Sequence, residues 1–319
     1  MISQPKVTVL IPCHSLRYLN RSISSINSQT LALDLFEVLL VTDRIDVLEA
    51  KSVLDELFAK FRIIKSDIPG IVPALNLGLQ HVNSKYVARM DEDDIMMPNR
   101  LEKQLKFLEE KKEVLAVGGQ LLLIDQSDTT IGKAIYRQKI RLLEKDLLAK
   151  SPLPHPATMF RLDSVRSVGG YRDFLPEDWD LWIRLREIGP IENLSDTVLK
   201  YRIHPGQLSK EKMYSQSIGK SFVAASYFAR KSNVRDCPET TESPEEWLQY
   251  TQVILRQKSK KYVKFETFDK KLEKVNLIFE SCGKIQKVYK TLSVGFQNPL
   301  VLIYYVYTRF SAKVKRHYS

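Results

Sequence analysis

Four acidic side chains follow directly after an apolar segment in the first third of the chain. Residues 86–90 read Tyr-Val-Ala-Arg-Met, which predicts a strand, and residues 91–94 read Asp-Glu-Asp-Asp. Like charges this close repel one another and need a compensating cation. Mg²⁺ is commonly held by one or two carboxylates together with substrate phosphates. The spacing of Asp91 and Asp93 therefore fits a metal–diphosphate site. The alternative is an acidic surface turn whose carboxylates cap the next helix.

A second acidic group occupies residues 176–180, Pro-Glu-Asp-Trp-Asp, at the expected start of a helix. Asp178 has two interpretations there. Acidic side chains interact favourably with the helix dipole, so Asp178 would be a simple N-cap. Alternatively, Trp179, Leu181 and Trp182 would surround the carboxylate with apolar groups and raise its pKa. A carboxylate fixed in this way suits the task of a general base.

Strands and helices alternate in the part of the chain that must position these carboxylates. The expected strands cover residues 7–11, 36–41, 61–64 and 86–90, and the expected helices end near residues 29, 59, 82 and 111. This alternation predicts βαβ units and a largely parallel sheet. The loops after three of these strands would gather residues 13–15, Asp43 and residues 91–94 at one edge. Ligands bind at that edge in open α/β sheets.

The rest of the chain divides into two parts. Further strands are expected at residues 115–118 and 121–124, and further helices at 142–150 and 178–187, whereas the prolines of residues 151–156 exclude a helix or a central strand. Beyond residue 209 the sequence becomes helical and increasingly basic, with a linker candidate at residues 233–246. We therefore expect one domain over residues 1–210 and a helical, basic region over residues 211–319.

The net charge of +11 belongs to the C-terminal end. Residues 251–319 hold 15 Lys/Arg and four Asp/Glu, which leaves 34 of each sign in residues 1–250. The apolar, tyrosine-containing residues 299–307 are too short to span a bilayer but suit its interface. Basic groups near an anionic leaflet contribute roughly 1 kcal/mol each. The two interpretations are attachment to a membrane surface and a helical appendage with a solvated basic face. No motif indicates specific nucleic-acid binding.

The cysteines and the N-terminus bear on the compartment. Cys13, Cys237 and Cys282 are widely scattered and give neither a disulfide framework nor a metal-ligand spacing. Residues 1–5 lead into the first expected strand without the basic and apolar regions of a signal peptide. We expect a cytoplasmic protein, peripheral on the inner face of the cytoplasmic membrane through residues 251–319.

The order of motifs over about residues 5–210 resembles glycosyltransferase family 2. In chain order these motifs are IPCHS, VTD, PALNLGL, VARMDEDD, HPATMFR, GGYR, EDWDLWIRL and YRIHPGQLS. The resemblance is to the non-processive enzymes of bacterial surface-polysaccharide assembly, such as O-antigen and capsule. It implies a Rossmann-like, mostly parallel α/β sheet flanked by helices (the glycosyltransferase A-type fold) with a helical C-terminal extension.

The resemblance also implies a reaction. A hexosyl or N-acetylhexosaminyl group would move with inversion from a nucleotide-diphospho-sugar, UDP-sugar first, to a hydroxyl of a glycan or lipid-linked acceptor. The implied cofactor is a divalent metal, Mn²⁺ or Mg²⁺. Two competitors are a sugar-1-phosphate nucleotidyltransferase and a non-catalytic nucleotide-sugar-binding module. The loop after the first strand is not the glycine-rich, basic one expected of the former, and the three residues Asp91, Asp93 and Asp178 together oppose the latter.

Site roles carry over residue by residue. Asp178 matches the catalytic base, and Glu177 would help to place the acceptor. Asp93 would hold the metal with Asp91, while His204 would approach the metal or the diphosphate, unless it is a surface-loop histidine. The predicted donor-binding residues are Pro12, His14, Ser15, Asp43, Arg89, Asp91, Glu92, Asp93 and Asp94. The predicted acceptor-side residues are His155, Tyr171 and Trp179.

The assignments of Asp43 and His155 leave a question open in the sequence itself. Asp43 matches the aspartate that reads the base, but residues 42–45 read Thr-Asp-Arg-Ile where many family members read Asp-Asp-Gly-Ser. The sequence of that loop therefore departs from the family pattern, while base recognition by Asp43 stays the expectation. His155 fits packing and acceptor contact equally well.

Overall fold

The computed structural model describes residues 4–140, 151–173, 176–204 and part of the stretch 223–236. By compactness the chain divides into two units, Met1–Thr240 and Thr241–Ser319, and the second unit lies outside the described residues. The expected helix at 142–150, most of the linker and of the basic region, and the domain boundary at residue 210 also lie there. They stay predictions.

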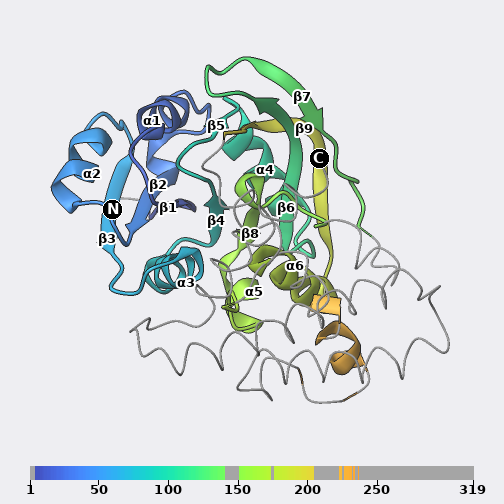
Figure 1. Cartoon of the computed structure of the whole chain (residues 1–319). Helices are drawn as coiled ribbons and strands as arrows, with labels where there is room; N and C mark the ends of the chain where they lie inside the picture. The colour runs from blue at the N-terminus through green and yellow to red at the C-terminus, as the bar shows by residue number, and fades with distance from the viewer. Residues whose placement is uncertain are drawn as a thin grey trace, which may run out of the picture. The chain divides into compact units, whose positions relative to one another are not determined.

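The N-terminal half of the sheet is parallel (Figure 1). Its strands are β1 (Val7–Cys13), β2 (Phe36–Thr42), β3 (Lys60–Lys65) and β4 (Tyr86–Arg89). They lie in the order β3-β2-β1-β4. The side chains of β1 are buried along its whole length, as expected for a strand covered by helices on both faces.

The second half of the sheet mixes directions. Its strands are β5 (Ile95–Met96), β6 (Ala116–Ile124), β7 (Thr130–Ala134), β8 (Met159–Arg161) and β9 (Ile191–Arg202). They extend the sheet in the order β4-β8-β6-β9-β5, and β7 pairs with β6 as a hairpin. The strand β8 is antiparallel to both β4 and β6, whereas β9 is parallel to β6 and antiparallel to β5.

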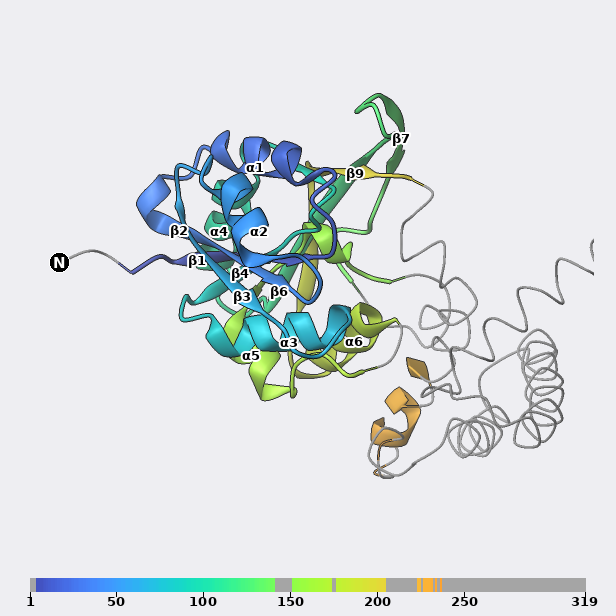
Figure 2. The same ribbon diagram turned by 60° about the vertical axis from the view of Figure 1, so that its left-hand side comes forward.

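Two helical layers cover the sheet. The helices are α1 (Leu19–Asn27), α2 (Val47–Leu54), α3 (Ile71–His81), α4 (Arg100–Glu110), α5 (Leu162–Ser167) and α6 (Glu177–Ile188). Successive side chains of a strand point to opposite faces, so Val9 and Ile11 join the core under α1, α2 and α4, while Leu10 joins the core under α3, α5 and α6. Figure 2 shows α3, α5 and α6 together on one side of the sheet. Short 3₁₀ helices occur at Leu33–Leu35 and His155–Ala157.

The predicted α/β architecture is confirmed, with local corrections. The two strands expected at residues 115–118 and 121–124 form the single strand β6, and α2 ends at Leu54 instead of residue 59. The helix α6 begins at Glu177 after Pro176, so Asp178 lies inside the first turn and is not the N-cap. Among the described helices, none has the length and apolar character that crossing a bilayer requires.

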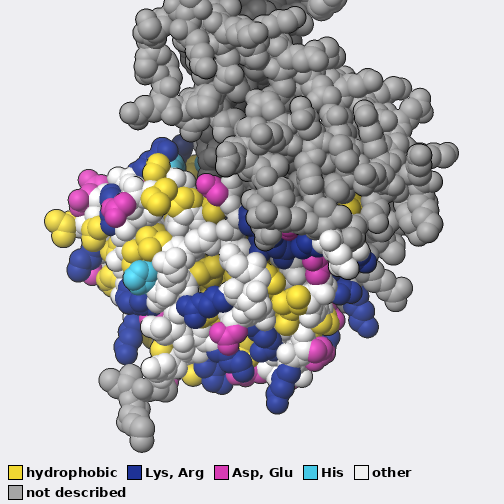
Figure 3. All heavy atoms as spheres, turned by 90° about the horizontal axis from the view of Figure 1, so that it is seen from below, with side chains coloured by type: hydrophobic (Ala, Val, Ile, Leu, Met, Phe, Trp, Pro, Cys, Tyr) yellow, Lys and Arg dark blue, Asp and Glu magenta, His cyan; other side chains and the backbone are white. Residues whose placement is uncertain are grey.

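The surface of the described part agrees with the charge count. On the face seen in Figure 3, Lys and Arg side chains are interspersed with acidic and hydrophobic ones. This mixture is what equal numbers of both signs in residues 1–250 predict.

Candidate active site

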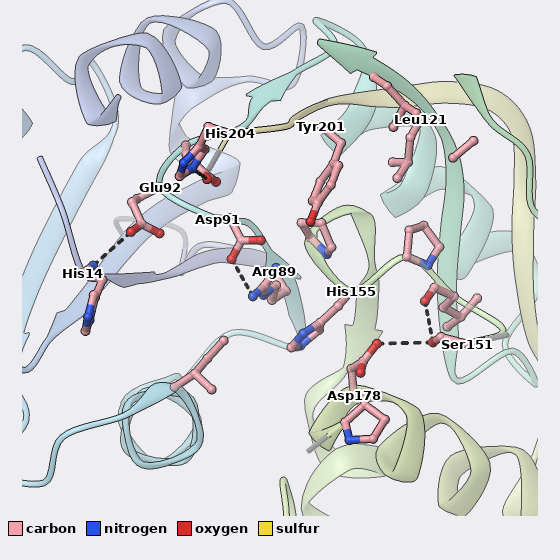
Figure 4. A pocket seen from close by; sticks show the side chains of 18 of the residues that line it. His14, Arg89, Asp91, Glu92, Leu121, Ser151, His155, Asp178, Tyr201 and His204 are labelled. Carbon is pink, nitrogen blue, oxygen red and sulfur yellow. Dashed lines mark hydrogen bonds and ion pairs between the residues drawn. The ribbon is translucent and has the colours of Figure 1, made fainter. Parts of the chain in front are cut away.

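A pocket of about 440 Å³ lies where the loop after β1, the turn after β4, the β6–β7 hairpin and the start of α6 meet. Its lining includes Asp91 and Asp93 from the turn after β4 and Glu177 and Asp178 from α6. Figure 4 shows these two acidic groups reaching the pocket from different elements, with His155 in the region between Arg89 and Asp178. The two acidic motifs, about 85 positions apart in the chain, therefore share one cavity.

The turn after β4 forms a compact group of carboxylates. One oxygen each from Asp91, Asp93 and Asp94 lies within 4.8 Å of the others. Asp91 is 2.5 Å from a guanidinium nitrogen of the buried Arg89, the last residue of β4. Burial and the charge of Asp91 raise the pKa of Asp93, which the hydrogen bond from His204 partly offsets. The Oδ2 of Asp94 is buried and has no hydrogen-bond partner among the described residues. A set of three crowded carboxylates with an unpaired oxygen and an adjacent imidazole fits a hard divalent cation.

Glu92 completes this turn on the side of the pocket next to the loop after β1. Its Oε1 accepts a hydrogen bond of 3.2 Å from the backbone N–H of His14, so the turn after β4 is tied to the loop after β1. Burial and the charges of Asp91 and Asp93 raise the pKa of Glu92 to about 8. Extra positive charge in the pocket would therefore favour ionisation of this carboxyl group.

The start of α6 supplies a candidate base. Burial raises the pKa of Asp178, and a 3.2 Å hydrogen bond from the Ser151 hydroxyl to its Oδ2 opposes that rise. Glu177 is 7% exposed, and burial together with the charge of Asp178 raises its pKa to about 7. Of the three apolar residues predicted around this carboxylate, Leu181 and Trp182 are fully buried, whereas Trp179 packs with Ile183, Val223 and Tyr227. A carboxylate with a raised pKa at a pocket wall is suited to accept a proton near neutral pH.

His155 stands between the two acidic groups as a neutral imidazole. Burial and the positive charge of Arg89 lower its pKa well below the usual value. Its Nε2 is 2.9 Å from the hydroxyl of Tyr171, and its Nδ1 is 3.6 Å from Glu177 Oε1. Tyr171 is in turn fixed by two backbone hydrogen bonds to the side chain of Asn76 on α3. His155 therefore both packs and lines the pocket.

The comparisons with known proteins agree with this geometry. Residues 8–168 match the family model described as Glycosyl transferase family 2. The chain belongs to glycosyl transferase family 2. The O-antigen biosynthesis glycosyltransferase WbnJ of Escherichia coli is 32% identical over 206 residues, which are 62% of this chain and 80% of WbnJ. The amylovoran biosynthesis glycosyltransferase AmsE of Erwinia amylovora is 35% identical over 149 residues, which are 45% of this chain and 54% of AmsE.

Solved structures identify the fold of this family 2 glycosyltransferase. S. aureus TarS 1-349 in complex with UDP-GlcNAc superposes with a TM-score of 0.53 at 17% identity, covering 78% of this chain and 71% of TarS 1-349. The mannosyltransferase PcManGT from Pyrobaculum calidifontis, in complex with GDP-Man and Mn²⁺, gives a TM-score of 0.52 at 15% identity, covering 91% of this chain and 83% of PcManGT. The fold is the glycosyltransferase A-type fold that the motifs implied.

Most of the predicted site residues of this glycosyltransferase line the pocket. Besides the acidic groups, His14, Ser15, Arg89, His155 and His204 do so. Imidazole Nε2 of His204 is 2.8 Å from Asp93 Oδ2, and both side chains are mostly buried, so this histidine lies beside the acidic turn.

Three of the predicted donor residues lie behind the pocket wall. Pro12 is buried within β1 opposite Val41. Asp43 accepts a 2.9 Å hydrogen bond from the backbone N–H of Gly70 and lies 3.3 Å from His14 Nδ1, so it reaches the pocket only through His14. Asp94 is fully buried and is not part of the lining.

Two of the predicted acceptor-side residues are also displaced from the pocket. Tyr171 lies behind His155. Trp179 packs in a cluster with Ile183, Val223 and Tyr227. Successive residues of a helix are about 100° apart, so a helix that turns Asp178 towards the pocket turns Trp179 elsewhere. The sequence analysis thus placed Tyr171 and Trp179 near the pocket, but it did not predict that their side chains point away from the cavity.

The sequence analysis did not predict one wall of the pocket. It is apolar and comes from the inner face of three strands, with Leu121 and Leu123 on β6, Ala134 on β7 and Tyr201 on β9. The register explains the wall, because Ala134 pairs with Leu121 and Tyr201 pairs with Leu123. The alternation of Leu121 and Leu123 was the available signal, but β7 and β9 were not predicted.

Proposed function

We propose that this chain is an inverting, metal-dependent glycosyltransferase that moves a sugar from a nucleotide-diphospho-sugar, UDP-sugar first, to a hydroxyl of a glycan or lipid-linked acceptor. The observation that supports this most is the shared pocket: a carboxylate group suited to a cation and a separate carboxylate with a raised pKa line the same cavity. Transfer of a sugar from a diphosphate needs both functions within reach of one substrate.

Asp91, Asp93 and His204 would hold the metal, Mn²⁺ or Mg²⁺. When bound, a divalent cation supplies positive charge that stabilises the departing diphosphate. Arg89 adds a fixed, buried guanidinium beside Asp91 and keeps that carboxylate oriented. His14 and Ser15 line the donor side next to Glu92, where the loop after β1 approaches the turn after β4.

Asp178 acts as the general base of the transfer. Its carboxylate takes the proton of the acceptor hydroxyl while the acceptor oxygen forms a bond to the anomeric carbon. The bond from that carbon to the diphosphate oxygen breaks on the opposite face, so the configuration inverts. General-base assistance of this kind contributes roughly 10²–10⁴-fold. Glu177 and the neutral His155 border the acceptor on the side of α6.

The acceptor and the cellular setting are inferred from composition and from relatives. The apolar wall of Leu121, Leu123, Ala134 and Tyr201 favours an acceptor that presents an apolar surface, such as the C–H face of a sugar or part of a lipid carrier. AmsE and WbnJ are named as biosynthesis glycosyltransferases of amylovoran and of O-antigen. We therefore place this enzyme in bacterial surface-polysaccharide assembly, on the inner face of the cytoplasmic membrane through the basic residues 251–319.

Nucleotide release from a panel of UDP-, GDP- and dTDP-sugars, with and without Mn²⁺, tests this function. We expect release from one donor that requires Mn²⁺ and is lost in Asp93→Ala. In Asp178→Asn, nucleotide binding should persist while turnover falls by roughly 10²-fold or more. Asp163→Asn, on the exposed side of α5, is the matched control.

The competing functions give different results in the same assay. A sugar-1-phosphate nucleotidyltransferase would form pyrophosphate from a nucleoside triphosphate. A binding module would bind nucleotide with no turnover in the presence of any acceptor. Unchanged turnover in Asp178→Asn would remove Asp178 as the base.

A further inference from the structure

Arg202, the last residue of β9, is a fully buried cation beside the carboxylates of the turn after β4. Its Nε donates to the backbone carbonyl of Asp93 at 2.7 Å, and its backbone N–H donates to Asp94 Oδ1 at 2.9 Å. One arginine thus holds two consecutive residues of the metal-binding turn, one through its main chain and one through its carboxylate. A buried guanidinium is costly unless hydrogen bonds and ion pairs compensate its charge, and here Nε and one terminal nitrogen make such contacts.

The other side of the same guanidinium holds the turn between β6 and β7. A terminal nitrogen of Arg202 donates to the backbone carbonyl of Asp125 at 2.9 Å and lies 2.5 Å from Asp128 Oδ1. The turn is itself well defined, because Asp125 Oδ1 accepts hydrogen bonds from the N–H groups of Ser127 and Thr129. Arg202 therefore connects the metal-binding turn to the tip of the β6–β7 hairpin.

The guanidinium also covers an aromatic ring that lines the pocket. Its central carbon lies 4.5 Å from the centre of the Tyr18 ring, and the ring of His204 lies 5.5 Å from the same ring. Cation–π contacts of this kind are favourable when they are desolvated. Tyr18 and His204 both line the pocket, so the position of Arg202 also bears on the imidazole next to Asp93.

We propose that Arg202 is a positioning residue that preorganises the metal-binding carboxylates, with Asp128 of the β6–β7 turn as its counter-ion. This rests on the proposed metal site. The carboxylates of Asp91, Asp93 and Asp94 repel one another before a cation arrives, and a fixed cation bonded to the turn reduces the cost of holding them together. Asp128 sets the orientation of Arg202, so the geometry of the hairpin tip affects metal affinity.

Asp128 contacts two arginines, the buried Arg202 and the partly exposed Arg21, so Arg21 provides a control for substitutions of Arg202. Its second oxygen, Oδ2, lies 2.9 Å from the guanidinium of Arg21, whose side chain is 46% exposed. Arg21 thus touches the same carboxylate from the solvent side, and its guanidinium also donates to the carbonyl of Gln126 at the hairpin tip and lies over the Tyr18 ring. Arg21→Gln removes a charge next to Asp128 and leaves the bonds from Arg202 to the metal-binding turn in place.

The experiment measures Mn²⁺ binding to the full-length protein with UDP present, by the electron paramagnetic resonance signal of free Mn²⁺. We expect Arg202→Gln to weaken Mn²⁺ binding by about 10–100-fold, as loss of groups that orient metal ligands typically does. Arg202→Lys should recover only part of the loss, because an ammonium cannot reproduce the planar fork. Asp128→Asn should weaken binding in the same direction by less, and Arg21→Gln should stay within about twofold of the unchanged protein.

Further readouts separate positioning from folding. At saturating Mn²⁺, kcat of Arg202→Lys and Asp128→Asn should approach that of the unchanged protein, since neither side chain touches the acceptor. Asp128 is 36% exposed, so its variant keeps the test available if Arg202→Gln does not fold. Unchanged Mn²⁺ affinity in folded Asp128→Asn and Arg202→Lys would overturn this proposal alone. Absence of Mn²⁺ binding in the unchanged protein would overturn the proposed metal site as well.

Discussion

The imidazole Nε2 of His204 lies 2.8 Å from the carboxylate Oδ2 of Asp93, although 111 positions separate the two residues. The contact exists because β5, which directly follows the acidic turn of residues 91–94, pairs with β9 just before its end: Ile95 lies opposite Lys200, and Met96 lies opposite Leu199. A strand of two residues thus completes the side of the pocket that we propose binds the metal.

Removal of this imidazole should weaken the response to metal. In His204→Ala we expect the Mn²⁺ concentration for half-maximal rate to rise about 10–100-fold, because a ligand or its orienting partner is lost. Part of the rate should return at high Mn²⁺. The exposed His81 at the end of α3 provides the control variant His81→Ala. Equal Mn²⁺ dependence of both variants would exclude a role of His204 at the metal.

The pH profile of transfer should respond to Ser151. Burial raises the pKa of Asp178, and the Ser151 hydroxyl lowers it by donating to the ionised form. In Ser151→Ala the pKa of Asp178 should rise further. A base must be deprotonated to act, so the acidic limb of kcat/KM should move to higher pH, with a larger loss of rate at pH 6 than at pH 9. A limb that does not move would mean that another group titrates. Ser167→Ala on α5 serves as control.

The folded state should become less stable as Glu177 ionises. The pKa of Glu177 in the folded protein is about 7, above the ordinary value of 4.5. Between these values the folded protein keeps a proton that the unfolded chain has lost, so stability falls as pH rises from about 4.5 to about 7. Glu177→Gln should raise the free energy of unfolding at pH 8, with about 1.4 kcal/mol for each unit of pKa difference, and should have little effect at pH 4. Urea unfolding at both pH values measures this, and a destabilised variant at pH 8 would contradict it.

Asp236 should stabilise the side of α6 that faces away from the pocket. Its Oδ2 lies 2.9 Å from Arg172 and 2.6 Å from Arg230, and Arg230 also pairs with Glu187 of α6. Loss of one partner of a buried pair typically costs about 3–5 kcal/mol. Since both arginines are about one-fifth exposed, we expect Asp236→Asn to lower the free energy of unfolding by about 2–3 kcal/mol.

A solvent-exposed ion pair provides the comparison for that measurement. Asp55 pairs with Lys51 on α2, and both side chains are 52% exposed. Asp55→Asn should change the free energy of unfolding by no more than about 0.5 kcal/mol. Similar values for Asp236→Asn and Asp55→Asn in urea unfolding would show that the buried pairs contribute little.

Two glycines should differ sharply in tolerance to alanine. A Cβ on Gly78 of α3 would lie 2.4 Å from Leu10 Cδ1, so Gly78→Ala should force α3 away from β1 and cost about 1–3 kcal/mol. At Gly132 on β7 the nearest atom, Leu123 Cδ1, is 3.6 Å away, and Gly132→Ala should be close to neutral. Thermal unfolding compares the two, and equal midpoints would refute the close packing of α3 on β1.

The parallel half of the fold was predictable because its strands are apolar and continuous. Residues 7–11 and 36–41 are almost uniformly β-branched or leucine, and polar residues follow each strand. The second half was not predictable in this way. The strand β9 reads Ile-Glu-Asn-Leu-Ser-Asp-Thr-Val-Leu-Lys-Tyr-Arg, where polar residues interrupt the alternation, and β5 and β8 have two and three residues.

The site was predicted better in its residue types than in their directions. Asp91, Asp93 and Asp178 were recognisable because acidic residues clustered at the end of a strand or the start of a helix repel one another and require a compensating partner. The inward or outward direction of Asp94 and Trp179 depends on tertiary contacts with Arg202 and with Tyr227, which local sequence does not contain. The role of Ser151 depends in the same way on its partner in α6.

The strand β9 connects the two acidic groups of the pocket. It is the next element after α6, which carries Glu177 and Asp178, and it ends two residues before His204, which contacts Asp93. A one-residue slip in strand pairing exchanges the two faces of a strand. A single inserted or deleted residue in β9 would therefore turn Tyr201 out of the pocket wall and carry His204 away from Asp93. In evolution, the partly exposed positions of β9 should therefore tolerate substitutions, whereas insertions and deletions within β9 should be selected against.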